Sequence, residues 1–166
     1  MTPVDLLDTL AEYVEEKTRC IDLQVRDKAN KQARRPPGVY KMRLPDKESE
    51  TRQIPYILLQ LITGKDVQPP GEDTDSSCKV RIVVATYSED GGIGSYDVLN
   101  VIARLRTCML SERVVADRYL LRIDPDNPLE YIVYQGEGVD PYYLGEMMTT
   151  WEMPTIEREV RQIWQR

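Results

Sequence analysis

The sequence contains no histidine among its 166 residues, and this absence removes a large part of the usual enzyme repertoire. Histidine is the common base of Ser/His and Cys/His nucleophilic sites, and it is the commonest ligand of catalytic zinc. Catalysis by carboxylates, lysine or tyrosine remains open. The composition nevertheless favours a protein that is not an enzyme.

Cysteine is also scarce, and the spacing of the three cysteines excludes two kinds of structural cross-link. Cys20, Cys78 and Cys108 are odd in number and lie far apart in the chain. A disulfide framework needs paired cysteines, and a Cys-only zinc site needs pairs separated by only a few residues. We therefore expect neither a bound metal nor a cofactor.

The chain has no long apolar run and carries an excess of acidic residues. No run approaches the roughly 20 apolar residues that cross a bilayer, and residues 1–5 lack the basic and apolar pattern of a secretory signal. The net charge is −6 and the sequence pI is about 4.8, whereas the binding face of a nucleic-acid-binding protein is usually basic. We expect a soluble protein that neither enters a membrane nor binds DNA by its sequence.

Two segments have the hydrophobic periodicity of amphipathic helices that pack on a core. The first is predicted over residues 3–18, with Thr2 as its N-cap and Pro3 in the first helical position. The second is predicted to begin at Ser95, which acts as its cap, and to end near Leu110. Its apolar stripe makes it the expected core helix.

Strands are predicted in five segments that are rich in β-branched and other apolar residues. They cover about residues 54–62, 79–87, 116–123, 129–135 and 146–153. The third and fourth strands are separated by a strong turn signal at residues 124–128, which predicts that they pair as an antiparallel hairpin. The order of elements indicates a single α+β domain over residues 1–166, with a small mixed or antiparallel sheet of about five strands.

Two stretches have the composition of loops. Residues 68–77 are polar and contain proline and glycine. Residues 25–53 are predicted to be an extended arm, although residues 39–44 alternate weakly in the manner of an edge strand. Between residues 26 and 43 this arm has one acid, Asp27, and seven cations, which are Arg26, Lys28, Lys31, Arg34, Arg35, Lys41 and Arg43.

The cations of the basic arm are candidate contacts to an acidic neighbouring subunit. The alternative is a solvated loop whose charge balances an acidic domain. Because few aromatic residues are interleaved with the cations, and no RNA-binding or helix-turn-helix signature accompanies them, base recognition is not expected.

A second group of candidate contacts lies near the end of the chain. Tyr142, Tyr143 and Trp151 belong to residue types that are enriched in interfaces, although tryptophan at strand spacing also suits a core. A short tail helix is predicted over residues 155–166, with Ile163 and Trp164 on its apolar stripe. Such a stripe suits docking against another subunit.

Two short motifs resemble ligand sites only superficially. The glycine-rich turn at residues 90–94 lies between a strand and a helix, but no lysine follows it, and Asp97 places a negative charge where a phosphate would dock. The acidic turn beginning at Asp124 lacks the glycine and the glutamate of a calcium loop, since Leu129 and Gln135 occupy those positions. Nucleotide and calcium binding are therefore not expected.

The order of these pieces over residues 54–156 resembles the tail terminator proteins, also called tail completion or neck proteins, of long-tailed bacteriophages and prophages. The resemblance covers roughly two thirds of the chain and involves no catalytic signature. The stretches that carry it are Ile54-Pro55-Tyr56-Ile57, the strand at 80–87, the helix start Gly94-Ser95-Tyr96-Asp97-Val98-Leu99-Asn100-Val101-Ile102, and Thr150-Trp151-Glu152-Met153-Pro154.

The resemblance implies a structural subunit that forms a hexameric ring on the finished tail tube within the virion neck, after assembly in the host cytoplasm. Such a ring ends tube polymerisation, binds the tail tube protein on one side and the head connector or head-completion protein on the other, and lets DNA pass through its lumen. An acidic chain suits a lumen that does not retain phosphates. The alternatives are another ring component of the neck, a small nucleotide-using enzyme, and a monomeric adaptor.

Overall fold

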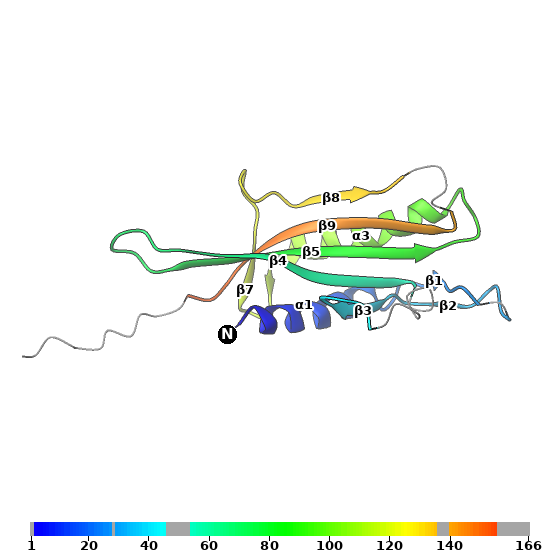
Figure 1. The fold of residues 1–166 in the computed structure, drawn as a ribbon, viewed down its shortest axis with the longest axis horizontal. Helices are drawn as coiled ribbons and strands as arrows, with labels where there is room; N and C mark the ends of the chain where they lie inside the picture. The colour runs from blue at the N-terminus through cyan, green and yellow to red at the C-terminus, as the bar shows by residue number, and fades with distance from the viewer. Residues whose placement is uncertain (1, 28, 46–53, 136–139, 156–166) are drawn as a thin grey trace, which may run out of the picture.

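The computed structural model describes residues 2–27, 29–45, 54–135 and 140–155, which form two helices packed on a curled mixed sheet (Figure 1). The α+β class predicted from the sequence is confirmed. The predicted sheet of about five strands is in fact a main sheet of seven strands, because several short strands were not recognised. Helix α1 spans Pro3–Thr18 and helix α3 spans Gly94–Glu112. The strands are β1 (Leu23–Gln24), β2 (Arg34–Arg35), β3 (Gly38–Lys41), β4 (Tyr56–Val67), β5 (Asp75–Tyr87), β6 (Val114–Val115), β7 (Tyr119–Arg122), β8 (Glu130–Val133) and β9 (Tyr142–Glu152).

Helix α1 has the predicted bounds and the predicted cap. The backbone N–H of Asp5 donates to the Thr2 hydroxyl at 3.3 Å, and the backbone N–H of Thr2 donates to the Asp5 carboxylate at 2.7 Å. This reciprocal capping box satisfies two amide groups that a helix end leaves without partners. A cap of this kind contributes about 1 kcal/mol to helix stability.

Helix α3 begins one residue before the predicted cap, and Ser95 does not cap it. The N-cap is Ile93, and no side chain bonds to the first turn. The helix nevertheless forms, because Val98, Ile102 and Leu105 are fully buried and tie its apolar stripe to the sheet. Tertiary packing therefore supplies the stability that a side-chain cap would have added.

Strand β9 is central to the sheet because it pairs on both of its edges. The order of the main sheet is β3-β4-β5-β9-β7-β6, and β8 also pairs with β9. One edge of β9 runs antiparallel to β5, while the other edge is shared by β8 and β7 at successive positions. The predicted hairpin between the third and fourth strands, β7 and β8, is therefore wrong.

The acidic turn at residues 124–127 connects β7 and β8, although the two strands do not pair. The Asp124 carboxylate accepts bonds from the backbone N–H groups of Asp126 and Asn127, each at 2.9 Å. The turn thus closes on itself as an Asx-type motif. The chain then leaves it to run along a different part of β9, which is long enough to receive both strands.

Strands β4 and β5 are longer than the sequence predicts and pair as a hairpin, which projects beyond the other described elements (Figure 1). The predicted polar loop at 68–77 is reduced to residues 68–74, since β5 already begins at Asp75. Residues 62–67 on the outer part of β4 are exposed. Backbone pairing, rather than hydrophobic burial, holds this part of the hairpin together.

The described part of the basic arm is more structured than predicted. Strand β3 confirms an edge strand near residues 39–44 and runs parallel to β4, whereas β1 and β2 form a small separate antiparallel sheet. Leu23 of β1 is buried in the main core, which fixes the start of the arm to the domain. The tail helix predicted over 155–166 lies, apart from Thr155, outside the described residues.

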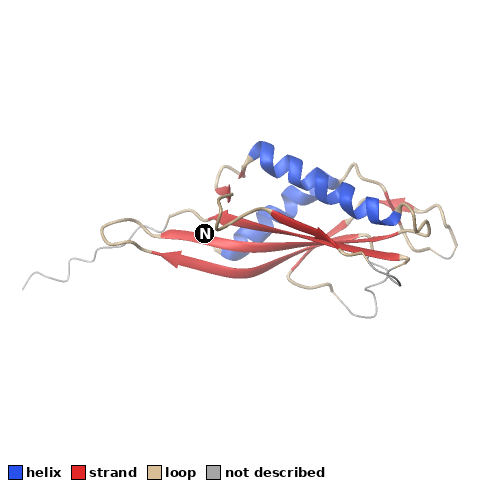
Figure 2. Cartoon of the chain, turned by 90° about the horizontal axis from the view of Figure 1, so that it is seen from above, coloured by secondary structure: helices blue, strands red, loops and turns tan. Residues whose placement is uncertain are grey.

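Both helices lie on the same side of the main sheet (Figure 2). The sheet residues that face them include Ile57, Ile82, Met147 and Trp151, all fully buried in one cluster with the apolar faces of α1 and α3. The opposite side of the sheet, called the open face below, carries no described helix. None of the described helices is long and apolar enough to cross a membrane.

Candidate interaction surface

Strand β8 has one backbone edge that is bonded to β9 and one that is not. Tyr134 donates its backbone N–H to the Leu144 carbonyl of β9 at 2.9 Å. Because backbone groups alternate in direction along an antiparallel strand, the N–H and C=O groups of Tyr131 and Val133 point away from β9. No described strand pairs with this outer side, which is called the β8 edge below. Unpaired edges of this kind are templates for another strand.

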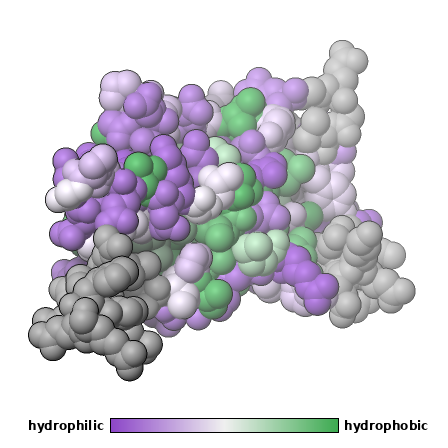
Figure 3. All heavy atoms as spheres, turned by 60° about the vertical axis from the view of Figure 1, so that its left-hand side comes forward, coloured by the Kyte–Doolittle hydropathy of each residue, from purple (hydrophilic) through white to green (hydrophobic). Residues whose placement is uncertain are grey.

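Large apolar side chains are exposed on both faces of β8. Tyr131 is 49% exposed and Ile132 is 50% exposed, and Tyr134 directly after the strand is exposed as well. A half-buried strand normally presents apolar residues on one face only. Figure 3 shows hydrophobic residues gathered across the middle of one face of the molecule, with hydrophilic residues around them.

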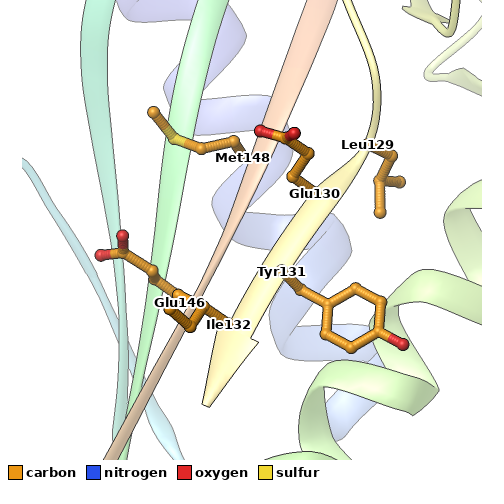
Figure 4. Close-up of a pocket in the computed structure, with 6 residues that line it drawn as sticks. All are labelled: Leu129, Glu130, Tyr131, Ile132, Glu146 and Met148. Carbon is orange, nitrogen blue, oxygen red and sulfur yellow. The ribbon is translucent and has the colours of Figure 1, made fainter. Parts of the chain in front are cut away.

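A hollow of about 530 Å³ lies beside β8. Figure 4 shows Glu146 and Met148 of β9 on the same side as Ile132, whereas the Tyr131 ring points away from them. This arrangement follows from the register, in which Ile132 pairs with Glu146 and cross-strand partners share a face. The residues that line the hollow are Leu129, Glu130, Tyr131, Ile132, Glu146 and Met148.

A charged pair lies on the open face beside this hollow. The Arg81 guanidinium of β5 donates through its Nε to the Glu146 carboxylate at 2.6 Å, and its terminal nitrogen forms an ion pair with the same group. The hydrogen bond from the Tyr134 phenol to this carboxylate, together with burial, raises the pKa of Tyr134. The ion pair with Arg81 keeps the Glu146 carboxylate beside the hollow.

A second hollow, of about 670 Å³, lies between β8 and the first two turns of α3. Tyr96 and Leu99 of the helix lie on one side of it and Val133 on the other, and both helix residues are exposed. Tyr131 and Ile132 line both hollows. The β8 edge is therefore flanked on each face by a hollow of a size that accepts large side chains.

The opposite edge of the main sheet is formed by β3 (Figure 1). Gly38 donates its N–H to the Pro55 carbonyl at 3.0 Å, and Met42 donates to the Leu59 carbonyl at 2.7 Å. The backbone N–H groups of Val39 and Lys41, which alternate with these donors, therefore point away from β4. No described strand pairs with this outer side, which is called the β3 edge below.

The two edges belong to segments of opposite charge. Residues 26–43, which include β3, hold seven cations and one acid. Residues 124–152, which include β8 and β9, contain no lysine or arginine. Their seven acids are Asp124, Asp126, Glu130, Glu137, Asp140, Glu146 and Glu152. Strand β3 forms one end of the strand order, whereas β8 lies off this order, on the edge of β9 that faces away from β5 and β3.

The structure brings two of the predicted contact residues together. The Arg26 guanidinium lies over the Tyr142 ring, 5.9 Å from its centroid, and donates a hydrogen bond to the Tyr142 hydroxyl. Tyr142 also packs against Tyr87, with 5.5 Å between ring centroids. This cation–π contact fixes the start of the basic arm to the first residue of β9.

The other cations of the arm are spread over the surface. Arg34 donates to the Asp22 carbonyl at 2.9 Å, Arg35 donates to the Pro36 carbonyl at 3.1 Å, and Lys41 forms an ion pair with Asp8 of α1. Lys31 and Arg43 are exposed. Three of the sequence-predicted contacts, namely Lys28, Ile163 and Trp164, lie outside the described residues.

Two of the predicted contact residues are core residues. Trp151 is 0% exposed and donates its indole N–H to the Thr149 hydroxyl at 2.9 Å. Tyr143 is also buried, and its hydroxyl donates to the Asp140 carboxylate. This hydrogen bond, with a contribution from burial, raises the pKa of Tyr143 to about 12. Neither side chain is accessible to a partner. The core interpretation that the sequence left open for Trp151 therefore applies, and Tyr143 is a core residue as well.

The glycine-rich turn before α3 has a packing role. A Cβ atom on Gly94 would lie 2.0 Å from the Tyr143 ring, so only glycine lets the helix start approach β9 so closely. Asp97 sits in the first helical turn, where burial raises its pKa. Within the described part of the chain, no group of three or more Cys, Asp or Glu side chains is arranged to hold a metal ion.

Sequence reasoning missed the surface around β8. Residues 131–134 are four consecutive large apolar residues, a run that a strand with one exposed face rarely carries. The absence of cations from 124 to 152 was a second signal. Taken together, these two patterns mark an apolar and acidic surface that is separate from the basic arm.

Comparisons with known proteins add little to this picture. No protein-family model matches the sequence, and no curated protein matches it. Solved structures do match, and one of them, whose name states no function, aligns over 93% of this chain and 94% of its own length. That chain shares 12% sequence identity, with a TM-score of 0.46. A likeness at this level supports no conclusion about function.

Proposed function

We propose that this protein is a non-catalytic assembly subunit that forms a ring at the head-proximal end of a phage or prophage tail tube. The observation that carries the proposal is the exposed strand β8, which presents apolar residues on both faces and an unpaired backbone edge. A chain that remained alone would leave these groups in water, and association removes them from it.

The projecting β4–β5 hairpin also supports an assembly role. Its outer part, residues 62–67 of β4, is exposed. A two-stranded ribbon is marginally stable by itself. We expect the hairpin to contact a neighbouring subunit or the tube, where a partner adds the packing that the chain itself does not provide.

The finer part of the proposal comes from the resemblance of residues 54–156 to tail terminator proteins. In this role a hexameric ring stops growth of the tail tube and presents its other side to the head connector. DNA passes through the lumen without sequence recognition, and a net charge of −6 suits this passage because an acidic wall does not bind phosphates. The protein then belongs to the neck of the virion.

The first test is the mass of the purified protein, measured by light scattering over a range of protein and salt concentrations. We expect a species near six times the 19.2 kDa chain mass, and a shift to smaller species at high salt if cations of the basic arm clasp a neighbour. A terminator that closes only on its tube gives a monomer in this measurement.

The second test uses polymerising tail tubes, because they distinguish a terminator from other assembly proteins. Adding the protein to growing tubes should arrest elongation and place one ring at one end of each tube, seen by negative-stain electron microscopy. Tubes that grow at an unchanged rate with bare ends would rule out the terminator role.

A further inference from the structure

We propose that the β8 edge of one subunit pairs with the β3 edge of the next subunit, so that neighbouring sheets join into one continuous sheet. This inference rests on the proposed ring and names the surfaces that build it. The β8 edge offers the outward backbone groups of Tyr131 and Val133, and the β3 edge offers the outward N–H groups of Val39 and Lys41. Both edges therefore have outward backbone groups that a strand of another subunit can pair with.

The strand directions define how the two edges meet. Strand β3 is parallel to β4, and the pairs β4–β5, β5–β9 and β9–β8 are all antiparallel. Strand β8 therefore runs opposite to β3 within one subunit. If neighbouring subunits are related by rotation about an axis parallel to the strands, every strand keeps its direction. Strand β3 of the next subunit then runs antiparallel to β8 of the first. Such a head-to-tail contact repeats and closes into a ring.

The hollows beside β8 fit the side chains that β3 would bring. Tyr40 lies on the open face, where it packs edge-to-face on Tyr56 with 6.4 Å between ring centroids. In a joined sheet, Tyr40 of the next subunit is on the face of the 530 Å³ hollow, beside Ile132 and Met148. Val39 alternates to the other face, where the 670 Å³ hollow lies against α3.

Charge favours this pairing over the two symmetric alternatives. A contact between two β8 edges would oppose like charges, since Glu130 is exposed and residues 124–152 have no cation. A contact between two β3 edges would bring together the segments that hold Lys31 and Arg43. Pairing β8 with β3 instead sets the acidic segment against the basic one, which favours the heterologous contact.

The test uses one proline at each edge, placed where its missing N–H points outward. Tyr131→Pro removes a donor from the β8 edge, and Lys41→Pro removes one from the β3 edge, while the bonds to β9 and β4 are kept. The matched controls, Tyr131→Ala and Lys41→Ala, lose the same side chains but keep the backbone N–H. Far-ultraviolet circular dichroism and urea unfolding confirm that each variant is folded.

A mixing experiment then separates a head-to-tail contact from a symmetric one. Each proline variant alone should remain a monomer in sedimentation velocity, at concentrations where wild type and the alanine controls associate. An equal mixture of the two variants should give a species of twice the 19.2 kDa chain mass, because one intact β8 edge and one intact β3 edge remain. A mixture that stays monomeric, or proline variants that associate like wild type, would overturn the inference.

Amide hydrogen exchange on the unmutated protein is an independent measurement. The amides of Tyr131, Val133, Val39 and Lys41 should become protected when the protein associates, and unchanged exchange at these four positions would overturn the inference. If wild type forms rings that the prolines do not affect, the inference fails while the proposed ring stands. If wild type is monomeric both in solution and on tail tubes, both proposals fail.

Discussion

Strands β5 and β8 are both antiparallel neighbours of β9, on its opposite edges, and they differ in how far their own chain buries their apolar residues. Both contain runs of large apolar residues, but in β5 Val80, Ile82 and Val84 are fully buried under the helices. In β8, Tyr131 and Ile132 are about half exposed. The apolar content of a strand therefore does not determine whether its own chain covers it; position in the sheet does.

The difference arises from the length and place of each pairing. Strand β5 pairs with β9 over residues 77–87 and with β4 on its other edge, so it is enclosed on both edges. Strand β8 pairs with β9 only over residues 130–133 and has nothing described beyond it. In a monomer, an apolar edge strand of this kind is open to unwanted pairing with other chains. In an assembly, the same edge can form the contact between subunits.

The largest effect that tests this comparison comes from one isoleucine in each strand. Ile82→Ala in β5 should cost about 2–5 kcal/mol of unfolding free energy, because its side chain is 0% exposed and truncation leaves a cavity. Ile132→Ala in β8 should change the unfolding free energy of the monomer by less than about 0.5 kcal/mol, because its side chain already contacts water. Urea unfolding at low protein concentration measures both values.

The same two variants should have the opposite order of effect on association between subunits. Ile132→Ala should weaken association, since it removes apolar surface beside the β8 edge, whereas folded Ile82→Ala protein should associate as wild type does. Equal losses of unfolding free energy in the two variants would show that the two strands are buried alike in solution, contrary to the comparison.

Local sequence patterns predicted most of the elements but not their arrangement. The bounds of α1 followed from Thr2, Pro3 and the helical spacing of its leucines, which are local signals. The hairpin between β7 and β8 was predicted wrongly because a turn signal shows only that the chain reverses. Whether the flanking strands pair depends on a distant strand, β9, and no local pattern contains that information.

The candidate surface was predictable only in part, for the same reason. The basic arm was visible as a run of cations, and the structure places it at the edge of the sheet opposite β8. Trp151 was read as a candidate contact because its residue type suits interfaces, whereas its place in the core follows from packing against α1 and α3. Exposure of β8 results from the order of strands, which the sequence pattern does not specify.

A smaller effect on stability should separate the packed centre of the sheet from the projecting hairpin. A Cβ on Gly145 of β9 would lie 2.5 Å from Val98 of α3, so Gly145→Ala should cost about 1–3 kcal/mol through overpacking. Gly64 of β4 is the matched control, because a Cβ there would meet only Cys78, at an ordinary 3.9 Å. Gly64→Ala should leave the midpoint of urea unfolding unchanged or slightly raised. A large loss in Gly64→Ala would indicate that the hairpin is packed more tightly than the structure shows.

The smallest effect concerns Tyr143, whose burial under α3 contrasts with the exposure of the tyrosines on β8. The hydrogen bond from its hydroxyl to Asp140, together with burial, raises the pKa of Tyr143 to about 12, from the ordinary phenol value of 10. The folded protein therefore holds this proton more tightly than the unfolded chain does.

The resulting stabilisation is complete below pH 10 and is lost as the pH rises from 10 to about 12. Ultraviolet absorbance at alkaline pH should show one fewer late-titrating phenol in Tyr143→Phe than in the wild type, and the unfolding free energy of this variant should fall less steeply over the same pH range. If the wild type and the variant lose stability with the same slope, the phenol is not held by Asp140, and the start of α3 is then more open to solvent, like β8, than its packing against Gly94 indicates.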